Sequence, residues 1–135
     1  MRLVISIAVL ALAACGGSSS GGGTTQDLVA ELTIHSGSIT TQTGTTAASI
    51  QVPNPGSIRF TNGDTVAHTI VVPTGSSNDC NPLNVGTIQP GASTPTVIVN
   101  NSTSGNEICT FSDSANPALS GNITILTQAT GGSGY

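Results

Sequence analysis

Turn signals interrupt this chain at short intervals, and they constrain its fold more than any other feature. The pairs Pro55-Gly56, Asn62-Gly63 and Pro90-Gly91 separate short stretches in which apolar and polar residues tend to alternate. Such alternation is typical of strands with one buried face, and turns every 8–12 residues or so are typical of a β-sandwich. We expect seven or eight strands, within residues 28–35, 49–52, 57–61, 66–72, 94–99, 107–111 and 121–127, and a loop over 73–82. No stretch has a helical period, so the predicted fold class is all-β.

The faces of these stretches indicate which side chains form the core. In the stretch 66–72, Val66, His68, Ile70 and Val72 fall on one face, because residues two apart in a strand point the same way. Tryptophan is absent and aromatic residues make up 2% of the chain, so Ile, Val, Leu and Ala must fill the core. Abundant Thr, Ser, Gly and Asn favour strands and turns over helices.

The first fourteen residues have the pattern of an export signal. Arg2 supplies a short positive region, and residues 3–14 follow without a charge, with Ser6 as the single polar side chain. A run of about twelve residues is too short to span a bilayer as a helix, which needs roughly twenty. It suits the apolar region of a secretory signal peptide. We therefore predict that residues 1–14 are a signal peptide.

The run ends in Leu12-Ala13-Ala14-Cys15, which resembles the lipobox of bacterial lipoproteins. The resemblance implies cleavage before Cys15, a lipid on its sulfur and anchoring in the bilayer, and Gly16 in place of Asp favours the outer membrane of a cell that has one. The Gly/Ser-rich segment that follows predicts a flexible tether over 15–26. The alternative is an ordinary signal cut after Ala11-Leu12-Ala13, which would leave Cys15 as a free thiol. We expect the folded domain at 27–130 and a flexible tail at 131–135.

Charge and motif content exclude several functions. After removal of residues 1–14, one arginine and six acidic side chains remain, a net charge of −5 with neutral histidines. Nucleic-acid binding and electrostatic docking to anionic lipid both need a basic patch, so neither is expected. No P-loop, CxxC, HExxH or EF-hand spacing is present, and we expect no enzyme. The sequence identifies no protein or small-molecule partner.

Residues 30–127 resemble the cupredoxin family in the order and spacing of several motifs. The run Pro55 to Asn62 (PGSIRFTN) resembles a strand that, in this family, precedes a copper-binding histidine across a turn, here His68. The run Leu119 to Ile125 (LSGNITI) resembles the closing strand of the family, with leucine in place of methionine. The resemblance implies a Greek-key β-sandwich and, in a complete member, a type 1 copper site.

The copper ligands that the resemblance implies are incomplete. A type 1 site needs two imidazoles and a thiolate, with a weak axial group. The resemblance places His68 at the first histidine, Cys109 at the thiolate and Leu119 at the axial position. No histidine stands between Cys109 and Leu119, where the second is expected, and His35 lies on the first predicted strand. The resemblance therefore implies a degenerate site, and no cofactor is expected.

A disulfide competes with copper for Cys109. If Cys15 carries a lipid, Cys80 and Cys109 are the remaining thiols, and two cysteines in an exported domain usually pair. A sulfur in a disulfide is not a thiolate and cannot bind copper. The favoured hypothesis is an envelope lipoprotein that acts as a binding or structural module. The alternative is a periplasmic electron-transfer protein with an atypical copper site at His68 and Cys109.

Overall fold

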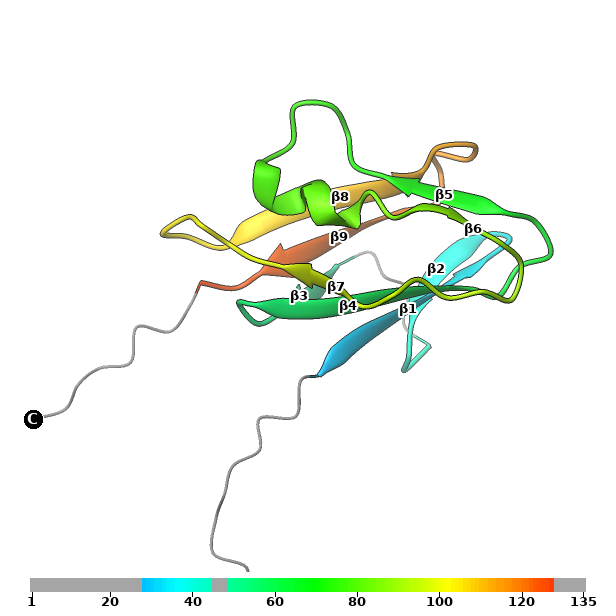
Figure 1. The fold of residues 1–135 in the computed structure, drawn as a ribbon, viewed down its shortest axis with the longest axis horizontal. Helices are drawn as coiled ribbons and strands as arrows, with labels where there is room; N and C mark the ends of the chain where they lie inside the picture. Colours follow the sequence, from blue (N-terminus) through cyan, green and yellow to red (C-terminus); the bar gives the residue numbers. More distant parts are fainter. Residues whose placement is uncertain (1–27, 45–48, 128–135) are drawn as a thin grey trace, which may run out of the picture.

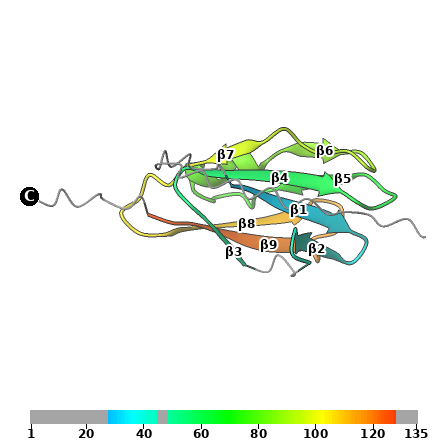
Figure 2. The same ribbon diagram turned by 90° about the horizontal axis from the view of Figure 1, so that it is seen from below.

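Two β-sheets face each other across an apolar core in the computed structural model, which describes residues 28–44 and 49–127 (Figure 1). One sheet has the strand order β2-β1-β4-β7 and the other β3-β9-β8-β5-β6. Viewed from below, the strands of the two sheets overlap, one sheet in front of the other (Figure 2). The elements are β1 (Val29–His35), β2 (Ser38–Thr41), β3 (Ile50–Val52), β4 (Gly56–Asn62), β5 (His68–Val71), the 3-10 helix η1 (Asn78–Leu83), β6 (Gly86–Ile88), β7 (Val97–Val99), β8 (Glu107–Asp113) and β9 (Ser120–Ile125). This confirms the predicted all-β sandwich.

Alternating side chains build the core as the sequence predicts. Leu32 and Ile34 on β1 are fully buried, and so are Ile58 and Phe60 on β4. Phe60 meets Phe111 of β8 across the core with ring centroids 5.3 Å apart and planes at 75°. Edge-to-face packing of this kind adds to the burial energy of the two rings. The pair therefore joins the two sheets at their centre.

Three local predictions differ from the structure. The edge strands β2 and β6 were not expected, because they span four and three residues and owe their form to pairing with β1 and β5. The 3-10 helix η1 replaces part of an expected loop, where Ser77 accepts a hydrogen bond from the Asp79 N–H. The strand expected from Val66 begins at His68, and Val66 is 55% exposed.

The two ends of the sandwich differ in what they carry. β1 begins beside the start of β4, with Val29 paired to Ser57, and β9 ends with Ile125 paired to Glu107 (Figure 1). We call this the β1-start end. β5 begins and β8 ends at the opposite end, which we call the His68 end. No helix among residues 28–44 and 49–127 is long and apolar enough to cross a membrane.

The predicted signal peptide, the lipid site Cys15, the tether over 15–26 and the tail over 131–135 lie outside the described residues.

Candidate functional site

His68 is held between two carboxylates at the His68 end. It opens β5, pairs with Ile88 of β6 and is 4% exposed. Its Nδ1 lies 2.9 Å from Asp113 Oδ2, and its Nε2 lies 3.2 Å from Asp64 Oδ2. The hydrogen bond to Asp113 raises the pKa of His68 more than burial lowers it, and Asp64 adds to the rise. The charged imidazolium is the form that can donate to both carboxylates.

Asp113 closes β8 and points into the protein, where it is 1% exposed. Its Oδ1 accepts the backbone N–H of Thr69 at 3.0 Å and that of Ala115 at 3.3 Å. Burial raises the pKa of Asp113, but the hydrogen bonds from His68 and these N–H groups outweigh it and leave the pKa lowered. Asp113 is therefore an ionised, fully bonded partner of His68 at neutral pH.

Asn62 places the second carboxylate. Its side chain is fully buried and donates to the carbonyls of Val66 and Ile88 at 2.7 and 2.9 Å. Its Oδ1 accepts the backbone N–H of Asp64 at 2.8 Å. A hydrogen bond from the Thr65 N–H lowers the pKa of Asp64, and contact with His68 lowers it further. Asn62 is thus more than the turn residue that its sequence position suggests.

The predicted disulfide is confirmed. Cys80 of η1 and Cys109 of β8 are bonded, with their Cα atoms 5.3 Å apart and a sequence separation of 29. Both residues belong to the buried core, with exposures of 1% and 0%. The bond fixes η1 to β8 beside the core.

The structure does not bring His68 and Cys109 together. Ile70 of β5 pairs with Asp113, so Asp113 is the β8 residue nearest His68. Cys109 stands four residues earlier on β8, about 13 Å along the strand at roughly 3.3 Å per residue. The resemblance placed a thiolate at Cys109, but the β8 side chain that faces His68 is the carboxylate of Asp113. The sequence missed both carboxylate partners of His68. The inward period of Cys109, Phe111 and Asp113 was the signal that could have revealed one of them.

Of the other residues considered for copper, Leu119 lies next to Asp113, whose N–H donates to the Leu119 carbonyl at 2.8 Å, whereas His35 is on the other sheet. His35 ends β1 in the opposite sheet and is exposed. Leu119 is 2% exposed and donates its N–H to the Asn116 carbonyl at 2.8 Å. Asn116, at a place where a second histidine was expected, is exposed in the turn after β8.

Comparison with known proteins supports the fold. A purple cupredoxin from Nitrosopumilus maritimus matches 71% of this chain and 98% of its own, with a TM-score of 0.51 and 17% identity. The fold is cupredoxin-like. An oxidised amicyanin variant matches 72% of this chain and 81% of its own at 8% identity, and a reduced variant 76% and 86% at 9%, both with a TM-score of 0.49. No family model and no curated protein matches the chain.

The donor set of this cupredoxin-like domain does not fit type 1 copper. That site requires two imidazoles and a thiolate around one ion. The whole chain contains two histidines, and His35 and His68 lie in different sheets. Both ring nitrogens of His68 face carboxylates, and the sulfur of Cys109 is in a disulfide. The three ligands cannot converge without breaking that bond and moving β8.

Proposed function

We propose that this chain is a lipid-anchored envelope protein whose cupredoxin-like domain serves as a binding or structural module rather than as a type 1 copper electron carrier. The observation that carries the proposal is the pairing of His68 with Asp113 and Asp64. A buried imidazole bonded at both nitrogens has no lone pair to offer a metal. The domain gains a fixed polar network at the end where a copper centre would need ligands. No catalytic role is proposed.

The alternative remains a copper protein, which the likeness in fold to the purple cupredoxin suggests. It would need a free thiolate at Cys109. Because Cys109 is in a disulfide with Cys80, we expect no free thiol when the unreduced Cys15→Ser protein is unfolded and titrated with a thiol reagent. Two thiols per chain should appear after reduction, because Cys80 and Cys109 are then the only cysteines. A full thiol equivalent before reduction would favour the copper alternative.

The strand directions determine which end of the domain lies next to the tether. β1 starts at the end opposite His68, so a tether that precedes β1 joins the domain there. With a lipid on Cys15, the tether joins the domain at the β1-start end, and the His68 end is the one farther from this attachment point. Residues of the turns at that end, such as Val66 and Pro117, are exposed and uncharged. This end is the part of the domain that a soluble partner meets first.

Anchoring is tested by replacing the lipid-bearing residue. In a bacterial host fed a labelled fatty acid, we expect the wild-type chain to carry the label and to sediment with membranes. Cys15→Ser should lose both properties, since one thioether-linked lipid group holds the chain. Ser18→Ala in the tether is the matched control and should behave like the wild type. Unlabelled wild-type protein in the soluble fraction would refute the anchor and leave the domain without a membrane role.

A further inference from the structure

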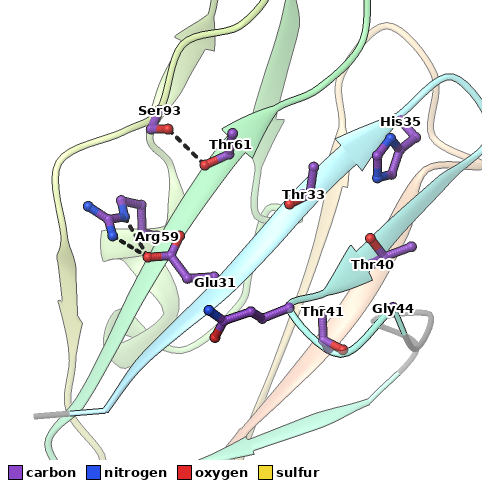
Figure 3. A pocket seen from close by; sticks show the side chains of 10 residues that line it. Glu31, Thr33, His35, Thr40, Thr41, Gly44, Arg59, Thr61 and Ser93 are labelled. Atoms are coloured by element: carbon purple, nitrogen blue, oxygen red, sulfur yellow. Dashed lines mark hydrogen bonds and ion pairs between the residues drawn. The ribbon is translucent and has the colours of Figure 1, made fainter. Parts of the chain in front are cut away.

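The outer face of the β2-β1-β4 sheet carries a shallow, open and mainly polar depression of about 710 Å³. Its floor is formed by side chains of β1 and β4 (Figure 3). Thr41 and Gly44 line it on one side and Ser93 on the other (Figure 3). We call this depression the β1–β4 hollow. It lies on the opposite sheet from His68 and is separate from the site described above.

A row of hydroxyl side chains crosses the β1–β4 hollow. Strand pairing aligns Thr40 with Thr33, Thr33 with Thr61, and Thr61 with Ser93. Neighbouring strands are about 4.8 Å apart, so the four hydroxyl groups form a regular line across the sheet. Each hydroxyl can donate one hydrogen bond and accept two. The row therefore offers repeated, uncharged hydrogen-bonding positions.

Part of this hydrogen-bonding capacity is unused. Among the described residues, no side-chain partner contacts the hydroxyls of Thr33 and Thr40 or the amide of Gln42, which also lines the hollow. Thr61 and Ser93, the other two hydroxyls of the row, bond each other at 2.7 Å, as Thr69 bonds Thr87 and Thr110 bonds Asn122 on the other sheet, each at 2.8 Å. The free polar groups are thus available to a ligand in the β1–β4 hollow.

The charges in the hollow favour an uncharged ligand. Arg59, the single arginine or lysine outside the predicted signal peptide, directs Nε and Nη2 to Glu31 Oε1. The pair is neutral as a unit, so Glu31 repels an anion and Arg59 repels a cation. The guanidinium has five N–H groups, and those that do not contact Glu31 can donate to a hydroxyl. A hydroxyl-rich neutral molecule matches this mixture of donors and acceptors.

We propose that the β1–β4 hollow binds a neutral carbohydrate. The proposal deepens the binding role suggested above and names its ligand class, and it rests on that role. Among the described residues that line the hollow, none is Phe, Tyr or Trp, the side chains with the largest surface to stack on a sugar ring, so we expect weak affinity, with Kd near the millimolar range. Weak single sites suit a membrane-anchored protein, because many copies on one surface bind a polymer together.

The test is a titration of the ¹⁵N-labelled mature chain carrying Cys15→Ser, followed by NMR. The probes are a tetramer of N-acetylglucosamine, a tetramer of glucose and, as a charged analogue, a tetramer of galacturonic acid. We expect saturable shifts from at least one neutral sugar at amides of β1, β2 and β4. Thr33→Val should raise Kd about three- to tenfold through loss of one hydrogen bond. Thr124→Val, on the outer face of β9, is the matched control and should leave Kd unchanged.

Three results would overturn the proposal. They are the absence of saturable shifts with both neutral tetramers, tighter binding of the charged tetramer, and shifts confined to the other sheet. An unchanged Kd in Thr33→Val, with its melting temperature equal to that of the wild type, would also overturn it. Each of these leaves the thiol and lipid experiments unaffected, so failure of the ligand class is distinguishable from failure of the proposed function.

Discussion

The double variant Cys80→Ala/Cys109→Ala is expected to lose about 3–4 kcal/mol of unfolding free energy. The bond joins residues with a sequence separation of 29, and the loss follows from the chain entropy that such a closed loop removes from the unfolded state. For a domain of this size, the loss lowers Tm by roughly 15–25 °C. Urea unfolding followed by circular dichroism measures it. The effect is large because the domain has few aromatic side chains to stabilise its core.

The matched control is the wild-type chain in excess reductant, in which no atoms of the core are removed. It should lose a similar free energy, which separates the cross-link from the cavity that alanine leaves. An unchanged Tm in both samples would show that the Cys80–Cys109 bond does not stabilise the domain.

Asp113→Ala is expected to cost about 3–5 kcal/mol, because it removes one partner of a buried ion pair. The variant leaves His68 and the Thr69 N–H without their acceptor in the core. Asp79→Ala is the matched control: Asp79 also accepts two hydrogen bonds, both from Ser102, but at the surface. We expect that change to have a much smaller effect. Equal losses in the two variants by urea unfolding would contradict a special role for Asp113.

The pH dependence of stability gives Asp113→Ala a second readout. The pKa of His68 is raised above its usual 6.5 in the folded protein, so its charged form is favoured by folding. That contribution is complete below about pH 6.5 and is lost as pH rises through the folded pKa. The pKa values of Asp113 and Asp64 are lowered, so their contributions are lost in acid. The wild type should therefore lose stability from neutral to alkaline pH, and the Asp113→Ala variant should show a weaker decline.

The sequence predicted the fold class well, because its strongest signal is local. Inward and outward residues alternate with a period of two in the long strands, such as β1 and β4, whose inward residues include Leu32 and Phe60. The short strands β2 and β6 carry too few residues for a period to appear. They form because β1 and β5 offer unpaired edges, which only the assembled sheet supplies.

The site was predicted less well, because the thiolate position was assigned from the identity of a residue and not from its place along the strand. Cys109 was matched to a thiolate by its identity, although β8 continues for four more residues. The residue that reaches His68 is Asp113, and the pairing of β5 with β8 determines this. Asp64 contacts the same ring from a turn that the buried amide of Asn62 holds in place. No short sequence motif indicates this contact. The disulfide, in contrast, followed from counting cysteines, and the structure confirms it.

Titration of the unreduced Cys15→Ser protein with Cu(II), followed by visible absorption, tests the central claim most directly. We predict no intense thiolate-to-copper charge-transfer band and the same spectrum for His68→Asn, because His68 is bonded to Asp113 and Asp64 and Cys109 to Cys80. An intense blue or green colour at one copper per chain, lost in His68→Asn, would contradict the account and establish the domain as a copper protein.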